Sequence, residues 1–286
     1  MILVTGATGN VGAALLALLA ERGLAVRALA RSEASRARIE DLGVEAAEGD
    51  FDRPDTLERA MEGCDHLFLL SPVQPDQAAR EKSAVDAAVR AGVEHVVAVS
   101  VMGAGHSSPY AFARWHAEVD DHLAASGLHH TLLRPAGFMQ THLLPVDTVR
   151  REATWYGMTG DGATAYVDAG DVAAVAAEVL AAPGHAGAVY ELTGPQSLSL
   201  PEASVILSEV LGQEVRYVDV PAEQFHANLA GAGLPGWLAD SIVALYGVIR
   251  EGHAATVTNA VEQVTGRPAR GYRQFLEAHK DAFSPS

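Results

Sequence analysis

Short apolar segments alternate with longer amphipathic segments along the first two thirds of the chain. Most of the short segments are runs of valine, leucine and alanine, which is typical of strands buried on both faces of a sheet. These strand candidates are residues 2–4, 25–29, 44–47, 66–70, 95–99, 131–133 and 189–192. The helix candidates between them are residues 10–22, 35–42, 54–61, 74–91, 111–126 and 172–181. This alternation predicts an α/β fold, a Rossmann-like doubly wound parallel sheet.

The pattern changes after about residue 195. There a predicted helix at 201–211 and a predicted strand at 214–220 precede mostly helical sequence. We therefore expect residues 1–195 to form the sheet domain and residues 196–286 to form a smaller, helix-rich C-terminal lobe. Residues 141–162 fit neither the strand nor the helix pattern and are a candidate to pack with the lobe.

A glycine-rich segment, VTGATGNVG at residues 4–12, follows the first strand candidate and opens the first helix candidate. Its glycines allow a sharp turn, a close approach to a diphosphate and tight packing of the helix on the strand. The helix N terminus offers free N–H groups and a partial positive charge to the same anion. The segment predicts a dinucleotide site, with a plain tight turn as the alternative. The residues assigned to it are Gly6, Thr8, Gly9, Asn10, Val11 and Gly12.

The end of the second strand candidate indicates which dinucleotide binds. An acid at this position holds the ribose hydroxyl of NAD, whereas an arginine accommodates the 2′-phosphate of NADP. Here Arg31 and Ser32 follow the strand, and Glu33 comes only after them. Because a guanidinium can hold a phosphate through two hydrogen bonds, we predict NADP(H). The alternative is a solvated cluster of arginines.

Further cofactor contacts are expected at the carboxyl ends of the later strands, where open α/β sheets bind their ligands. After the third strand, Asp50 and Phe51 are predicted to contact the adenine, although Asp50 could instead cap the next helix. The fourth and fifth strands add four candidate contacts, which are Leu70, Ser71, Pro72 and Ser100.

Composition excludes several other functions. The 286 residues include 36 acidic and 20 basic residues, and the net charge of −16 would repel nucleic acid and anionic membranes. The single cysteine, Cys64, excludes a disulfide framework and a cysteine-based zinc site. Since no leader or membrane-spanning run is visible, we expect a cytoplasmic protein that acts on a small molecule without a metal. The oligomeric state stays open.

Together these segments resemble the atypical short-chain dehydrogenase/reductase proteins of the NmrA-like branch, which includes triphenylmethane reductases and NADPH-dependent quinone oxidoreductases. The resemblance covers nearly the whole chain. It depends on VTGATGNVG, GDF at 49–51, SGLHHTLLRP at 126–135, LSEVLG at 207–212 and the region of Trp237. It implies cofactor contacts at residues 8–11, 70–73, Arg31 and Ser100, and contacts near the nicotinamide from Pro135 to Phe138.

The Tyr-x-x-x-Lys pair on which ordinary members of this superfamily depend is absent. The chain has two lysines, Lys82 and Lys280, and neither follows a tyrosine at that spacing. Three interpretations remain open. His116, or less favourably Tyr110, serves as the proton donor or orients the cofactor. Alternatively, the acceptor is electrophilic enough to need no protein acid, or no reaction occurs.

A set of mostly aromatic side chains suits a flat acceptor, although each could equally belong to the core. The predicted substrate wall consists of Trp115, Phe138, Met139, His142, Trp155 and Trp237. We predict an NADP(H)-dependent oxidoreductase that passes a hydride to a small planar acceptor such as a quinone, an imine or iminium, or a dye. Residues 1–195 would bind the cofactor and the lobe the substrate. The alternative is a non-catalytic, NADP(H)-sensing regulator.

Overall fold

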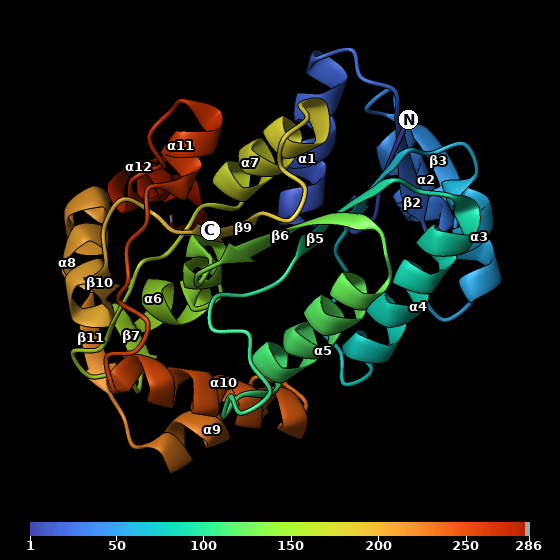
Figure 1. The fold of residues 1–286 in the computed structure, drawn as a ribbon. Helices are drawn as coiled ribbons and strands as arrows, with labels where there is room; N and C mark the ends of the chain where they lie inside the picture. Colours follow the sequence, from blue (N-terminus) through green and yellow to red (C-terminus); the bar gives the residue numbers. More distant parts are fainter. Residues whose placement is uncertain (284–286) are drawn as a thin grey trace.

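The computed structural model describes residues 1–283 and has a seven-stranded sheet at its centre (Figure 1). The strands are β1 (Ile2–Val4), β2 (Val26–Ala30), β3 (Glu45–Glu48), β4 (His66–Leu69), β5 (His95–Val99), β6 (His129–Pro135) and β9 (Val189–Leu192). Their order is β3-β2-β1-β4-β5-β6-β9, and all neighbours are parallel. The predicted doubly wound sheet is confirmed. Its order reverses between β1 and β4, and such a switch point is where these sheets bind ligands.

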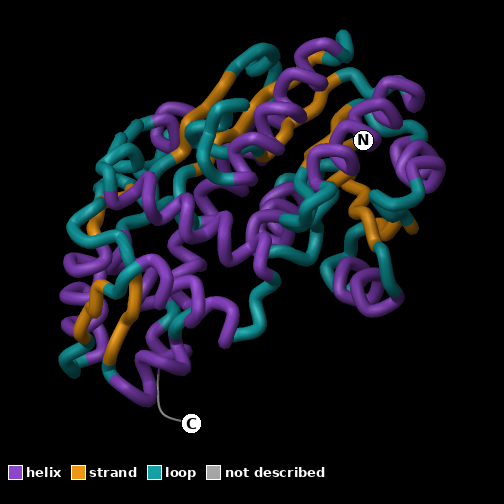
Figure 2. Tube along the Cα trace, turned by 90° about the horizontal axis from the view of Figure 1, so that it is seen from below, coloured by secondary structure: helices purple, strands orange, loops and turns teal. Residues whose placement is uncertain are grey.

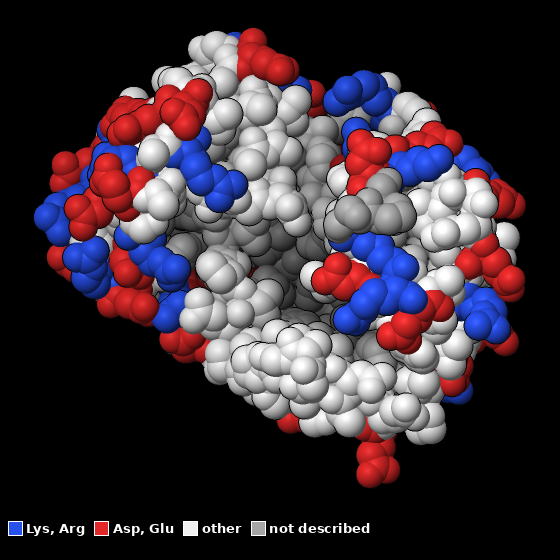
Figure 3. Space-filling model, turned by 180° about the vertical axis from the view of Figure 1, so that it is seen from behind, with Lys and Arg blue, Asp and Glu red and all other residues white. Residues whose placement is uncertain are grey.

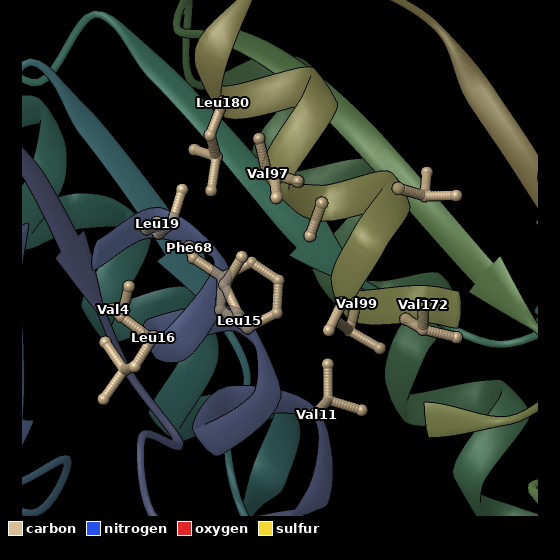
Figure 4. Packing of buried hydrophobic residues seen from close by; sticks show 14 of the residues in the cluster. Val4, Val11, Leu15, Leu16, Leu19, Phe68, Val97, Val99, Val172 and Leu180 are labelled. Carbon is tan, nitrogen blue, oxygen red and sulfur yellow. The ribbon is translucent and has the colours of Figure 1, made fainter. Parts of the chain in front are cut away.

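Helices cover both faces of the sheet (Figure 1). On one face α1 (Asn10–Glu21) packs against α7 (Ala169–Ala181), and on the other lie α3 (Pro54–Met61), α4 (Gln77–Ala91) and α5 (Ala111–Ala125). Figure 4 shows how α1 and α7 contact the sheet through Leu15, Leu19, Val172, Leu180, Phe68 and Val97, all 5% exposed or less. Burial of each such side chain contributes roughly 1.5–3 kcal/mol. This packing fixes α1, and with it the loop that precedes α1.

The C-terminal third adds helices beside the main sheet. These are α8 (Leu200–Leu211), α9 (Ala222–Gly231), α10 (Gly236–Arg250), α11 (Ala260–Thr265) and α12 (Tyr272–Ala278). A separate parallel pair, β7 (Thr154–Gly157) with β11 (Arg216–Asp219), lies across the molecule from the N terminus (Figure 2). Through this pair, residues 154–157 join the C-terminal helices. Of the helices in residues 1–283, none has the length and apolar character that crossing a membrane requires.

The remaining elements are short. They are α2 (Glu33–Glu40), the 3₁₀ helix η1 (Met139–Leu143), α6 (Val146–Glu152), the antiparallel pair β8 (Ala163–Thr164) and β10 (Leu198–Ser199), and the 3₁₀ helix η2 (Lys280–Phe283). Thus η1, α6 and β7 occupy the segment 141–162, in which the sequence pattern predicted no element.

Three predicted helix starts were wrong, two of them because of local capping. α2 begins two residues early, because Ser32 caps it in a reciprocal pair with Ser35. α7 begins at Ala169 because the Asp168 carboxylate accepts the Gly170 N–H at 2.7 Å. α4 begins only at Gln77, so the proline at position 75 precedes the helix rather than forming its first turn.

Candidate functional site

The loop between β1 and α1 presents unpaired backbone donors to solvent. Gly9 is the N-cap of α1, and no side chain caps this helix end. Thr8, Gly9 and Asn10 are exposed at the tip of the loop, whereas Val11 is buried. The free N–H groups of the first turn and the positive end of the helix dipole therefore face outward, which is the arrangement that binds a phosphate or diphosphate.

Two glycines of this loop are required by its geometry. A Cβ atom on Gly12 would lie 2.2 Å from the carbonyl oxygen of Gly6, so α1 can approach the loop only without a side chain there. Gly6 has a φ of +62°, and a Cβ atom on it would lie 2.9 Å from the carbonyl oxygen of Leu70. Gly9 differs, because its nearest atom would be 3.4 Å away. Its lack of a side chain instead leaves the outer surface of the loop open.

Thr5 connects this loop to the end of β4. Its hydroxyl oxygen lies 3.0 Å from the carbonyl oxygens of both Phe68 and Leu70, and it accepts the Leu70 N–H at 2.9 Å. The side chain is fully buried. Sequence reasoning missed this residue. A threonine between an apolar strand and the first glycine is the signal that could have found it, because a buried hydroxyl needs hydrogen-bond partners.

The end of β2 carries an exposed, unengaged cation. The Arg31 side chain makes no hydrogen bond or ion pair with any other residue in 1–283, and Glu33, the nearest acid along the chain, is the first residue of α2. Ser32 is engaged locally: its hydroxyl accepts the Ser35 N–H at 3.2 Å. Arg31 is therefore available to an external anion, while Ser32 has a structural role in capping α2.

Asp50 does not cap α3, so that alternative prediction was wrong. Its carboxylate accepts the Asp52 N–H at 3.0 Å in a local turn, whereas the N-cap of α3 is Arg53, without a side-chain cap. Asp50 and Phe51 are both half-buried. Phe51 packs on the apolar cluster beneath α3 and α4. Both residues lie after β3, and their predicted contact with the adenine stays a prediction.

The two serines at the ends of β4 and β5 are held by buried acids. Ser71 donates its hydroxyl to Glu81 of α4 at 2.6 Å. Ser100 donates to Asp120 of α5 at 2.9 Å, and Arg134 pairs with the same oxygen of Asp120 at 2.8 Å. In each case the helix after the strand supplies a carboxylate to the hydroxyl at the strand end.

Burial governs the protonation of these acids. Desolvation raises the pKa of Glu81 to about 7, although the hydrogen bonds from Ser71 and Gln77 act to lower it. Desolvation also raises the pKa of Asp120, and the hydrogen bonds from Arg134 and Ser100 oppose that rise. Both acids lie on buried helix faces that are mostly apolar, each with one other polar side chain, Gln77 on α4 and His116 on α5. The signal in the sequence that could have found these acids is a polar residue at helical spacing within an apolar stripe. Such a residue indicates a partner, because buried acids are rare unless paired.

His116 and Tyr110, the two candidate proton donors, point at protein groups. The imidazole of His116 is 8% exposed and lies 3.3 Å from the Gln77 amide nitrogen. Burial lowers its pKa to about 4, so it is neutral at pH 7. The Tyr110 hydroxyl donates to the Met102 carbonyl at 3.2 Å, and burial raises its pKa. A neutral imidazole and a weakened phenol are both poor acids, so neither residue is assigned as the proton donor.

We expect His116→Phe to weaken folding more than turnover. The substitution leaves one N–H of the buried Gln77 amide without an acceptor, while the other still donates to Glu81. This loss should lower the free energy of unfolding by about 1–3 kcal/mol. Turnover should fall less than tenfold, because no acid is lost. Steady-state kinetics and urea unfolding of the same preparation measure both quantities. A loss of a hundredfold or more in kcat would restore His116 as an acid.

Three of the six predicted substrate residues belong instead to the core. Met139, His142 and Trp155 are 1%, 3% and 5% exposed and pack in one cluster with Tyr166 and Tyr272. His142 Nδ1 and the Tyr272 hydroxyl share a 2.7 Å hydrogen bond, and burial lowers the pKa of His142 to about 3. This packing leaves no surface on these residues for an acceptor, so the predicted substrate wall was wrong for these three.

The other three predicted substrate residues are half-exposed. The rings of Trp115, on α5, and Trp237, on α10, pack against each other with centroids 5.8 Å apart. They thus connect a helix that covers the main sheet to one of the C-terminal helices. Phe138 lies just after β6, and its exposure is also partial. On the rear of the molecule a central hollow has largely uncharged walls, while charged side chains lie on its rims (Figure 3). The surface over α9 and α10 below it carries few charges.

A second hollow lies beside the glycine loop. It has a volume of about 410 Å³, and its lining includes Asn10 of α1, Gln140 of η1 and Arg270. Arg270 is partly neutralised there by Asp168, at 3.4 Å. In residues 1–283 no group of three or more histidine, cysteine, aspartate or glutamate side chains could hold a metal ion.

Comparison with known proteins shows that this chain is similar to NAD(P)H-binding ones. Residues 6–183 match the family described as NAD(P)H-binding. The chain is 38% identical over 283 residues to the NAD(P)H azoreductase of Xenophilus azovorans, and the match covers 99% of each protein. Among solved structures it resembles the Escherichia coli quinone oxidoreductase QOR2 complexed with NADPH (TM-score 0.90, 28% identity, 98% of this chain and 100% of that one). It also resembles the Citrobacter sp. triphenylmethane reductase complexed with NADP(H) (TM-score 0.89, 26% identity, 97% and 99%).

Proposed function

The chain belongs to the NAD(P)H-binding family, and from this membership and the site geometry we propose that it is an NADPH-dependent reductase of planar, electrophilic acceptors. The resemblance to the NmrA-like branch of atypical short-chain dehydrogenases/reductases is confirmed by its similarity to the quinone oxidoreductase and the triphenylmethane reductase. One observation carries the proposal: the uncapped N terminus of α1 and the unengaged guanidinium of Arg31 lie at the ends of the neighbouring strands β1 and β2.

The residues at this edge of the sheet fit the parts of NADPH. The backbone from Thr8 to Val11 would hold the diphosphate, since the N–H groups of Asn10 and Val11 make no backbone hydrogen bond within residues 1–283 and Gly9 keeps the surface open. The Gly9 N–H itself donates to the Gly6 carbonyl oxygen. Arg31 would pair with the 2′-phosphate, since no acid at the end of β2 competes for it. The ends of β4 and β5, with Ser71 and Ser100, would border the nicotinamide half.

When bound, NADPH supplies a hydride and the protein supplies position. The three relatives and structural neighbours are named for azo compounds, quinones and triphenylmethane dyes, which are all flat and conjugated. Such acceptors are electron-poor and can take a hydride without prior protonation. A quinone or azo compound becomes an anion when it takes a hydride and then needs a proton, whereas a cationic dye or an iminium ion needs none. Because His116 and Tyr110 are both engaged by protein groups, that proton would come from water. Trp115, Phe138 and Trp237 would contact the flat face of the acceptor.

The proposal is tested by mixing the protein with NADPH and a panel of quinones, azo dyes, triphenylmethane dyes and iminium ions. We expect the nicotinamide absorbance to fall with at least one acceptor class. Trp237→Ala should lower kcat/KM for that acceptor about tenfold and leave the KM for NADPH unchanged, because the ring would contact the acceptor and not the cofactor. Tight NADPH binding without turnover of any acceptor would favour the regulatory alternative. Absence of NADPH binding would overturn both.

A further inference from the structure

We infer that Glu81 is a positioning residue of this site: its proton decides whether the Ser71 hydroxyl donates into α4 or toward the cofactor. The inference rests on the proposed NADPH site. It depends on a buried chain of hydrogen bonds that starts at the end of β4 and ends on α5.

The chain has four members. Ser71, at the end of β4, donates to Glu81 Oε1 at 2.6 Å, and the Gln77 amide nitrogen donates to the same oxygen at 3.3 Å. That nitrogen also lies 3.3 Å from His116 Nε2. Glu81 and Gln77 are each 1% exposed, Ser71 is 6% exposed and His116 is 8% exposed. Hydrogen bonds in such an enclosed group depend strongly on one another, because water cannot replace any of them.

The amide of Gln77 defines the proton positions. An amide nitrogen only donates, so Glu81 Oε1 and His116 Nε2 must both accept, and the imidazole carries its proton on Nδ1. The other end of the amide, Gln77 Oε1, is buried and has no donor within residues 1–283. The observed arrangement suits an ionised Glu81, whose Oε1 accepts both bonds, and it leaves the Gln77 acceptor unsatisfied.

A proton on Glu81 weakens the bond from Ser71 without requiring any other change in this chain of hydrogen bonds. The Gln77 amide can keep its orientation, because a half turn would carry both of its N–H groups to the position where Oε1 now makes no hydrogen bond within residues 1–283. Glu81 no longer attracts the Ser71 proton as an anion does, because bonds to a charged acceptor are about twice as strong as neutral ones. Ser71 can then donate out of α4, toward the cofactor.

The surroundings support titration of Glu81 near neutral pH. Burial disfavours its anion, and Asp120, which faces it from α5, disfavours the anion further. The nearby cations are engaged elsewhere: Arg80 by Asp52 and Asp76, Lys82 by Glu118, and Arg134 by Asp120. From α3, Glu58 pairs with Arg90 of α4. His116 is neutral. No cation therefore stabilises the Glu81 carboxylate directly.

The test compares NADPH binding by the wild type and Glu81→Gln between pH 6 and pH 8.5, measured by calorimetry. The wild type should bind NADPH about threefold to tenfold more weakly at pH 8.5 than at pH 6, relative to the variant, because ionised Glu81 withdraws one hydrogen bond. The 2′-phosphate titrates equally in both proteins, so their ratio isolates Glu81. Parallel profiles would overturn the inference.

Two further variants separate binding from folding. Ser71→Ala should lose the pH dependence of binding but keep that of unfolding. Glu118→Gln, an exposed carboxylate on α5, should change neither. For unfolding, the pKa of Glu81 is about 7 in the folded state, whereas an unfolded glutamate loses its proton near its usual pKa of 4.5. The wild type should therefore lose stability relative to Glu81→Gln as the pH rises from about 4.5 to about 7, and the difference should then stay constant.

These measurements also distinguish the inference from the proposed function. If neither protein binds NADPH, the proposed function fails, and the role assigned to Ser71 fails with it, whatever the unfolding curves show. If both bind NADPH with the same pH profile while unfolding still reports a titrating Glu81, only the positioning role is overturned.

Discussion

Gly12→Ala should reduce NADPH binding by a hundredfold or more. The added Cβ atom would lie 2.2 Å from the Gly6 carbonyl oxygen and 2.7 Å from its carbon, and both atoms belong to backbone that cannot turn aside as a side chain can. The loop and the first turn of α1 must separate, which disperses the N–H groups that would hold the diphosphate. Calorimetry with NADPH measures the loss. Binding near the wild-type affinity would show that the loop does not hold the cofactor.

Gly9→Ala is the matched control for this prediction. Its nearest neighbour would be the Gly6 carbonyl oxygen at 3.4 Å, and its φ of −84° suits any residue. We expect the free energy of unfolding to change by less than about 1 kcal/mol, whereas Gly12→Ala should lose about 3 kcal/mol or more from overpacking. NADPH binding by Gly9→Ala should still weaken, because the methyl group would occupy the open surface of the loop. This pair of variants separates damage to the fold from damage to the site.

Arg31→Ala should weaken NADPH binding about tenfold to a hundredfold and leave NADH binding almost unchanged. The expected size is that of a hydrogen-bonded charge pair, about 1.5–3 kcal/mol, and only NADPH carries the phosphate that would make it. Because Arg31 is exposed and makes no bond with other residues in 1–283, its removal should not change stability. Binding of both nucleotides to the purified variant tests the assignment.

Arg38→Ala provides the comparison, since Arg38 is also exposed but lies in the last turn of α2, away from the end of β2. Arg38→Ala should change the affinity for NADPH by about twofold at most, because salt screens the attraction between this distant charge and the cofactor. Equal losses for NADH and NADPH in Arg31→Ala would contradict the assignment of the 2′-phosphate. Equal losses in both arginine variants would indicate general attraction of anions.

The substrate residues illustrate where sequence reasoning fails. Trp155 and Trp237 are equally plausible contacts for a flat acceptor, yet Trp155 is buried in β7 and Trp237 is half-exposed beside Trp115. Aromatic rings suit cores and clefts alike. The difference arises because β7 pairs with β11, about sixty residues later, which encloses Trp155 among the C-terminal helices. No pattern within 141–162 predicted that pairing.

The buried acids are a second example. Glu81 and Asp120 stand in helices whose ends the sequence placed within a few residues, but their partners Ser71 and Ser100 lie on strands. Both acids lie on the buried faces of α4 and α5. Helical spacing alone does not show that each of these faces turns toward the end of the preceding strand, because that depends on how α4 and α5 pack on the sheet.

The sequence by itself determined the sheet, the glycine loop and Arg31 at the end of β2, because each depends on residues close together in the chain: buried runs of valine and leucine, glycines at fixed spacing, and a strand end. The tertiary structure alone decided that His116 faces Gln77 rather than a cleft, that Met139, His142 and Trp155 fill the core, and that Glu81 reaches Ser71. The physical reason is that a side chain's solvation and protonation depend on neighbours from distant segments, and only packing brings these together.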